Sequence, residues 1–277
     1  MGRIIDGTAI AKELLDELKL RIKESGVKPK LAVVAVGDSA ASKIYLKSKE
    51  AACSHTGVLF EKYILPPSTS EEELINLIKE LNESDADAVM LQLPLPSRIN
   101  AEKIIQLIEP SKDADGVHPL NLGKLLAGDE SIPPCTPAGV IELLRRSGIS
   151  VSGKNAVVVG RSNIVGKPLA AMLLNRDATV TVCHSKTKNL AEITKKAELL
   201  AVAVGKPNFI TAEMVREGAV VVDIGINKLE GKTVGDVDFE RVKEKASAIT
   251  PVPGGVGPMT VASLIKNTFS LALARTG

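Results

Sequence analysis

The sequence predicts an α/β fold with two α/β domains, the second built on a Rossmann-like parallel sheet, and with a cleft between the domains. Short valine-rich runs alternate with segments whose apolar residues recur at helical spacing, which indicates a mostly parallel sheet with helices on its faces. The chain has 277 residues, enough for two domains of ordinary size. The expected domains are residues 1–137 with 262–277, and residues 138–261.

The alternation is clear in the first half of the chain. Helices are expected where apolar residues keep helical spacing up to a glycine, or where a capping box such as Ser70 to Glu73 opens the segment. Strands are expected at continuous apolar runs. The expected order is helix Thr8–Ser25, strand Leu31–Val36, helix Ser39–Thr56, strand Val58–Leu65, helix Ser70–Leu81 and strand Ala88–Leu91.

The second half continues the same pattern. A helix with Thr136 as its N-cap and Pro137 in its first turn is expected to lead into the second domain and to stop at Gly148. A final helix from Pro258 to about Ala274 carries an apolar stripe that is expected to pack on the first domain. The strands expected between these helices are Ala156–Val159, Thr179–Cys183, Leu199–Val204 and Val220–Ile224.

The composition excludes several classes of protein. The net charge is only +2, and the chain has no Trp, two Tyr and four Phe, so neither the charge nor the stacking platforms of a nucleic-acid binder are expected. Three widely spaced cysteines indicate reduced thiols in a cytosolic protein, and no metal site is expected. The sequence has no signal-peptide core and no apolar run near the ~20 residues that span a bilayer, so no membrane association is expected.

Residues 156–168, AVVVGRSNIVGKP, carry the clearest functional pattern. An apolar strand runs into Gly160, and Gly166 precedes a helix-like segment, which is the arrangement that binds a dinucleotide pyrophosphate. The middle glycine of the usual fingerprint is replaced by Ser162. An ordinary strand–turn–helix in an α/β domain is the alternative interpretation.

The residues after the next strand favour NADP as the dinucleotide. An NAD-binding fold usually places a carboxylate there for the ribose diol, but residues 184–188 read HSKTK and contain none. Arg161 and Ser185 are the preferred partners of a ribose phosphate. Lys186 and Lys188 add positive charge, although at least one of them is expected to be merely solvated.

A second candidate group lies on the early helix. Ser42, Tyr45 and Lys49 stand at positions that share one helix face. If that face borders a dry cleft, burial lowers the lysine pKa and suits it to proton transfer. A surface lysine beside a half-buried tyrosine is the commoner meaning of this spacing.

Three further segments carry unusual residues. Gln92 follows an expected buried strand, at the end where open α/β sheets bind ligands. Asp113 and Asp115 lie in a loop before a glycine, where a turn or cap is the alternative. Residues 251–260, PVPGGVGPMT, combine flexible glycines with stiff prolines ahead of a helix N-terminus, which allows the backbone to approach a flat ligand closely.

In this order, these motifs make the whole chain resemble the bifunctional methylenetetrahydrofolate dehydrogenase/methenyltetrahydrofolate cyclohydrolase family. The resemblance implies oxidation of 5,10-methylenetetrahydrofolate with NADP and hydrolysis to 10-formyltetrahydrofolate. It also implies a cytosolic homodimer, with the first domain binding folate and the second NADP.

The resemblance assigns roles by position. Lys49 is expected to be the acid/base of the cyclohydrolase step, Gln92 to support it, and Tyr45 and Asp115 to act there and bind the folate. The other expected substrate-binding residues are Ser42, Pro253, Gly254 and Gly257. The expected cofactor-binding residues are Gly160, Arg161, Ser162, Val165, Gly166, Ser185 and Ile226.

Other functions stay open at this stage. A dehydrogenase without cyclohydrolase activity fits most of the same residues, and a shikimate-dehydrogenase-like oxidoreductase shares the expected layout. A non-catalytic NADP sensor would keep the glycine turn but not the four residues assigned to catalysis. A short-chain dehydrogenase is disfavoured because its glycine motif precedes its Tyr and Lys.

Overall fold

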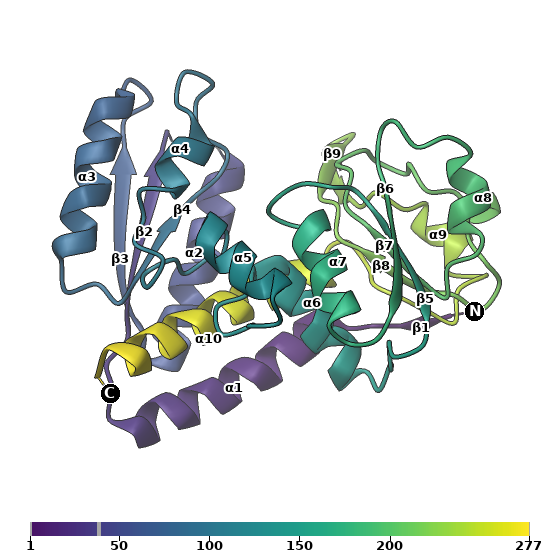
Figure 1. Cartoon of the computed structure of the whole chain (residues 1–277), viewed down its shortest axis with the longest axis horizontal. Helices are drawn as coiled ribbons and strands as arrows, with labels where there is room; N and C mark the ends of the chain where they lie inside the picture. The colour runs from purple at the N-terminus through teal and green to yellow at the C-terminus, as the bar shows by residue number, and fades with distance from the viewer. Residues whose placement is uncertain (1, 38–39, 277) are drawn as a thin grey trace. The chain divides into compact units, whose positions relative to one another are not determined.

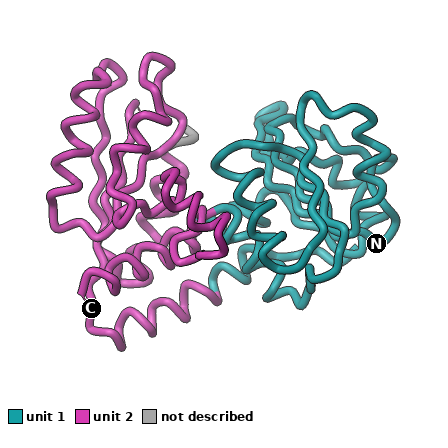
Figure 2. The backbone as a smooth tube through the Cα atoms, in the orientation of Figure 1, with its two compact units in different colours: residues 1–12, 136–260 teal, residues 13–135, 261–277 magenta. Residues whose placement is uncertain are grey.

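The computed structural model describes residues 2–37 and 40–276, and the side chains of residues 40–42 lie outside the description. The chain divides into two compact units, which Figure 2 shows in different colours. Unit 1 comprises Met1–Lys12 and Thr136–Thr260, and unit 2 comprises Glu13–Cys135 and Val261–Gly277.

Unit 1 is built on a six-stranded parallel sheet with the order β1-β11-β8-β7-β5-β6 (Figure 1). The strands are β1 (Arg3–Ile4), β5 (Asn155–Val159), β6 (Thr179–Cys183), β7 (Leu199–Val202), β8 (Val220–Asp223) and β11 (Ala248–Ile249). The strand that follows β5 in sequence, β6, pairs with one edge of β5, and the next strand, β7, pairs with its other edge. The carboxyl ends of β5 and β7 therefore form a topological switch point, where such sheets bind ligands.

Valine-rich strands explain this sheet. The central strands are buried along almost their whole length, and their side chains form a core with Val157, Leu200, Val221 and Ile249. Continuous apolar runs are typical of parallel strands that are covered on both faces. The helices of the unit are α6 (Cys135–Arg146), α7 (Gly166–Leu174), α8 (Leu190–Thr194) and α9 (Phe239–Val242), with a hairpin of β9 (Asn227–Leu229) and β10 (Lys232–Val234).

Unit 2 contains a three-stranded parallel sheet with the order β3-β2-β4. Its elements are α2 (Ala40–Thr56), α3 (Glu71–Glu83), α4 (Ala101–Ile105), α5 (Pro119–Leu126), β2 (Lys30–Val36), β3 (Leu59–Leu65) and β4 (Ala88–Leu91). The central strand β2 is buried from Leu31 to Val36. The predicted capping box is confirmed, because Ser70 and Glu73 exchange side-chain to backbone hydrogen bonds at the start of α3.

The expected long elements are confirmed with small shifts at their ends. Helix α6 begins at Cys135, so Thr136 is not its N-cap; the Thr136 hydroxyl instead bonds with that of Thr260 at 3.0 Å. The last helix, α10 (Val256–Thr276), is longer than expected at both ends. Helix α1 (Gly7–Ser25) and α10 each contribute residues to both units.

Residues 1–12 differ from the expected division of the chain. They group with unit 1, although the sequence placed them in the first domain. The reason is that β1 pairs in parallel with β11 at the edge of the six-stranded sheet. None of the helices formed by the described residues is long and apolar enough to cross a bilayer.

Candidate active site

The first group of predicted residues lies on α2 in unit 2. Tyr45 and Lys49 stand one helical turn apart, on the same face. Tyr45 is half-buried, and Lys49 is only 4% exposed, whereas the neighbouring Lys47 faces solvent. Ser42 belongs to the same helix, but its side chain lies outside the described part of the structure. The interpretation of Lys49 as a surface lysine is therefore wrong.

Lys49 is held by the glutamine that follows β4. Its Nζ donates to Oε1 of Gln92 at 2.5 Å, and Nε2 of Gln92 donates to the Leu93 carbonyl at 2.8 Å. The second bond leaves the amide oxygen of Gln92 facing the lysine. The backbone N–H of Gln92 donates to Val34 in the central strand β2, which ties this arrangement to the core of the sheet.

Electrostatics link Lys49 to Asp115. Burial lowers the pKa of the Lys49 ammonium, and the attraction of the Asp115 carboxylate opposes part of that shift. Burial also raises the pKa of Asp115, against the attraction of Lys49. Both groups are therefore weakly solvated, and the Lys49 ammonium loses its proton more readily than a lysine in water does.

The loop that carries Asp115 is shaped by Asp113. The Asp113 carboxylate is 1% exposed and accepts hydrogen bonds from the backbone N–H groups of Gly116 and His118 and from Nδ2 of Asn121. These three bonds, at 2.8–3.1 Å, use its oxygens for local structure. The alternative interpretation of a structural turn thus holds for Asp113, while Asp115 remains available to a ligand.

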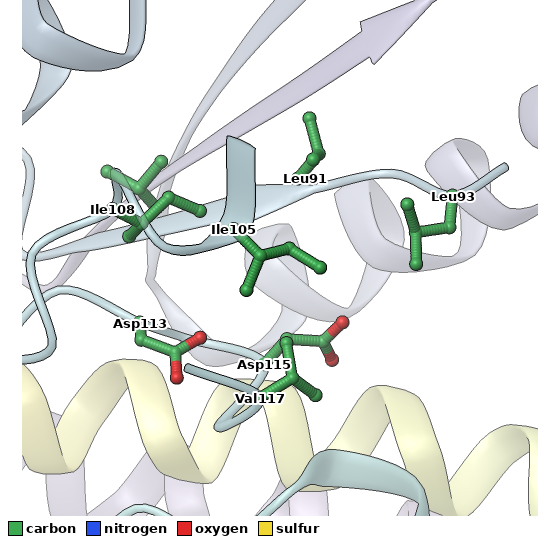
Figure 3. Close-up of a pocket in the computed structure, with 8 residues that line it drawn as sticks. Leu91, Leu93, Ile105, Ile108, Asp113, Asp115 and Val117 are labelled. Atoms are coloured by element: carbon green, nitrogen blue, oxygen red, sulfur yellow. The ribbon is translucent and has the colours of Figure 1, made fainter. Parts of the chain in front are cut away.

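Both carboxylates border a small pocket whose other lining is apolar. Its wall includes Leu91, Leu93, Ile105, Asp113 and Asp115. Figure 3 shows the carboxylates on one side of the pocket, opposite the leucine and isoleucine side chains. An apolar wall with a few polar groups is typical of small-molecule sites.

In unit 1, two glycines form the turn between β5 and α7. Gly160 has φ +128°, and a Cβ there would lie 2.2 Å from the Ala203 carbonyl oxygen. A Cβ on Gly166 would lie 2.2 Å from the carbonyl oxygen of Gly160. Only glycine allows these backbones to pack together and leaves the helix N-terminus open to a pyrophosphate, so the turn fits a dinucleotide.

Ser162 completes that turn. Its Oγ accepts hydrogen bonds from the backbone N–H groups of Val165 and Gly166, at 3.2 and 3.4 Å. Arg161 is exposed beside it. Because the N–H of Gly160 donates to the Cys183 carbonyl at 2.9 Å, the ends of β5 and β6 lie together. This pairing brings the segment with Arg161 close to the exposed Ser185.

The remaining predicted residues of the same unit lie after β8 and around the start of α10. Ile226 follows β8 and is 48% exposed. A Cβ on Gly257 would lie 3.9 Å from Cδ1 of Ile226, so the first turn of α10 packs near this side chain. Gly254 has φ +100°, and its carbonyl accepts a hydrogen bond from the Thr8 N–H at 3.0 Å. Pro253 lies in the same loop, next to Gly254.

The structure also identifies supporting residues that sequence reasoning missed. Asn267 of α10 donates to the carbonyls of Ala114 and Pro133, at 3.0 and 2.9 Å, and so holds the Asp115 loop. Asp223 and Asp236 are buried in unit 1. Asp223 could have been identified from the sequence as a carboxylate at the end of an expected buried strand. No local pattern distinguishes Asn267 from other polar residues of a helix.

The side chains that most often bind metals are not clustered in the described part of the chain. Within residues 2–37 and 40–276, no group of three His, Cys, Asp or Glu side chains has a metal-binding arrangement. Cys53, Cys135 and Cys183 are buried free thiols, as expected. Burial raises the pKa of the Cys135 thiol well above its usual value, so this thiol stays protonated.

Fold and site together define a nicotinamide-dinucleotide-binding α/β enzyme with a separate acid–base group. Residues 5–115 match the family described as "Tetrahydrofolate dehydrogenase/cyclohydrolase, catalytic domain", and residues 134–276 match its "NAD(P)-binding domain". The chain belongs to the tetrahydrofolate dehydrogenase/cyclohydrolase family. The predicted family resemblance and the two-domain α/β fold are therefore confirmed.

Individual relatives cover the chain from end to end. The "Bifunctional protein FolD" of Campylobacter hominis is 54% identical over 99% of this chain and 98% of that protein. The crystal structure of the bifunctional dehydrogenase/cyclohydrolase from Campylobacter jejuni is 49% identical, with a TM-score of 0.95 over 99% of this chain and 100% of that one.

A third relative bears on the cofactor. The Trypanosoma brucei dehydrogenase-cyclohydrolase, complexed with NADP and an inhibitor, is 37% identical, with a TM-score of 0.94 over 99% of this chain and 98% of that one.

Shikimate 5-dehydrogenase from Thermus thermophilus is 16% identical, with a TM-score of 0.59 over 89% of this chain and 94% of that one, and shares only the fold. The shikimate-dehydrogenase-like alternative is therefore disfavoured.

Proposed function

We propose that this chain oxidises 5,10-methylenetetrahydrofolate with NADP and hydrolyses the 5,10-methenyl product to 10-formyltetrahydrofolate, with Lys49 as the proton carrier of the hydrolysis. The observation that carries the proposal is the buried ammonium of Lys49, bonded to Gln92 and electrostatically coupled to Asp115. We assign the folate chemistry to unit 2 and the dinucleotide to unit 1, and we propose Pro253, Gly254 and Gly257 as further folate-binding residues.

The oxidation needs alignment more than acid–base chemistry. Loss of a hydride from the methylene carbon leaves a cation that the lone pairs of its two neighbouring nitrogens stabilise. NADP supplies the hydride acceptor when it is bound. The protein binds the dinucleotide at the glycine turn, with Arg161 and Ser185 at the ribose phosphate, while Tyr45 and Asp115 hold the folate ring.

The hydrolysis needs a proton carrier. Water adds to the methenyl carbon and loses one proton, which leaves a neutral hydroxyl adduct. One carbon–nitrogen bond of this adduct then breaks: its nitrogen gains a proton, and the hydroxyl loses its own proton to solvent as the formyl C=O forms. A neutral lysine can accept the first proton and return it to the leaving nitrogen. The lowered pKa of Lys49 makes that neutral form accessible, and Gln92 keeps its Nζ in place.

The test is a mixture of the protein, 5,10-methylenetetrahydrofolate and NADP. We expect NADPH absorbance to rise and 10-formyltetrahydrofolate to accumulate. A rise in NADPH with accumulation of the methenyl compound would identify a dehydrogenase without cyclohydrolase activity. No NADPH, under conditions where both compounds bind, would contradict the proposal.

We also propose a cytoplasmic homodimer, as expected for the family. The three-stranded sheet of unit 2 ends at β3, an edge strand with exposed Leu59 and Ile64. An edge strand of this length with exposed apolar side chains favours pairing with a second copy. Light scattering should give twice the chain mass for the protein and the chain mass for Ile64→Lys. A monomeric wild-type protein would contradict the dimer.

A further inference from the structure

Two buried carboxylates in unit 1 have no part in the mechanism above. Asp223 ends β8 and is 3% exposed, and Asp236 follows the β9–β10 hairpin and is completely buried. Burying a carboxylate is costly unless several hydrogen bonds compensate for its lost hydration. The partners of these two carboxylates therefore indicate what they are for.

Asp236 organises the loop that follows β7. Its Oδ2 accepts from the backbone N–H groups of Val204 and Gly205, at 2.6 and 2.9 Å, and its Oδ1 accepts from that of Lys206 at 2.8 Å. Nδ2 of Asn227, in the segment after β8, donates to the same Oδ1 at 2.8 Å. One side chain thus connects the loops after two neighbouring strands.

Asp223 forms hydrogen bonds with the adjoining segments. Its carboxylate accepts from the backbone N–H groups of Gly225, Asp236 and Val237 at 2.9–3.1 Å. Its own backbone N–H donates to Oγ1 of Thr250 at 2.8 Å, directly before the glycine-rich loop. These contacts leave no room for a side chain at Gly225, where a Cβ would lie 2.0 Å from the Asp236 carboxyl carbon.

The loops held in this way border the dinucleotide turn. The loop after β7 begins at Ala203, whose carbonyl oxygen occupies the space of the absent Cβ of Gly160. The segment after β8 carries Ile226 between Gly225 and Asn227, which both contact Asp236. Both loops lie at the carboxyl ends of the parallel strands, where a dinucleotide binds.

We propose that Asp223 and Asp236 are positioning residues for the dinucleotide, because their carboxylates hold the loops after β7 and β8 against the glycine turn. This inference rests on the proposed role of unit 1 in NADP binding. Neither carboxylate touches the ligand; each sets the backbone that does. Replacement of Asp236 by asparagine leaves one acceptor oxygen for four donors and presents an NH₂ group to N–H groups.

The experiment is NADPH binding without folate, read by nucleotide fluorescence, for the wild type and for Asp236→Asn. We expect about tenfold weaker binding, because hydrogen bonds to a charged group are lost from the loops. The matched control is Asp238→Asn, the same change two residues away, where the carboxylate makes a 3.7 Å ion pair with the exposed Arg241. Its NADPH affinity should equal that of the wild type.

Kinetics separate positioning from general loss of structure. In Asp236→Asn the KM for NADP should rise while the KM for methylenetetrahydrofolate stays unchanged. If that variant does not fold, Asn227→Ala removes a single donor and should weaken NADPH binding by a smaller factor. Unchanged NADPH affinity in folded Asp236→Asn, or in Asn227→Ala when Asp236→Asn does not fold, would overturn the inference. Failure of the wild type to bind NADPH would instead contradict the proposed function.

Discussion

The two units use aspartates in different ways. In unit 1, Asp223 and Asp236 are both buried and bonded to several backbone N–H groups. In unit 2, Asp113 and Asp115 border the same pocket, but Asp113 is bonded to backbone N–H groups in the manner of the unit 1 aspartates, whereas Asp115 is coupled to Lys49. The acid proposed to bind the substrate is thus distinguished from the acids that shape loops by its coupling to a buried lysine and by its greater exposure.

This difference has a physical reason. A carboxylate that accepts several N–H donors fixes the backbone around it. A carboxyl group beside a buried lysine can bind a ligand or change the pKa of that lysine. Residue type and spacing alone did not separate Asp113 from Asp115.

The largest expected contrast is therefore between those two neighbours. Asp113→Asn removes an acceptor oxygen from backbone donors and should lower the unfolding free energy by about 2–3 kcal/mol. Asp115→Asn should change stability less but raise the KM for folate at least about tenfold, since it alters a ligand contact. Urea unfolding and steady-state kinetics of both variants measure this; equal effects on stability and on KM would remove the distinction.

A smaller effect is expected at the ribose phosphate. Arg161→Ala would remove the charge-assisted hydrogen bond proposed to the ribose phosphate, so the KM for NADP should rise about tenfold while that for NAD stays unchanged. Lys186→Ala, in the exposed loop after β6, is the matched control and should change the KM for NADP less. If the wild type used NAD and NADP equally, the roles of Arg161 and Ser185 would be contradicted.

A separate effect concerns the pH dependence of stability. Burial raises the pKa of Asp223 from 3.8 to about 7 in the folded protein, with the charge of Asp236 contributing. The folded state therefore holds a proton that the unfolded state releases, and this group's contribution to stability falls as pH rises from about 4 to about 7. In Asp223→Asn that decrease should be absent. Unfolding free energies of both proteins across this range provide the test; a wild-type minus variant difference that stays constant with pH would refute it.

Much of the fold was predictable because it follows from local pattern. Long apolar strands and amphipathic helices appear close to where the sequence places them. The two-residue strands β1 and β11 were not predicted, since they exist only through pairing between distant segments. That same pairing explains why residues 1–12 belong to unit 1 rather than to the first domain.

The family resemblance, more than residue spacing, assigns Tyr45, Lys49, Gln92 and Asp115 to the site. The structure confirms the expected support of Lys49 by Gln92, and the roles of the four residues stay predictions. The supporting residues were not predicted, because Asn267 and Asp236 act on backbone groups that are remote in the sequence. The expected cleft between the domains stays a prediction.

Methenyl hydrolysis by Lys49→Met tests the central claim most directly, because methionine has an unbranched side chain but carries no ammonium. We predict that hydrolysis slows by about 10²–10⁴-fold relative to the wild type, while NADPH affinity, which depends on unit 1, stays the same. Equal rates of methenyl hydrolysis in the two proteins would contradict the account.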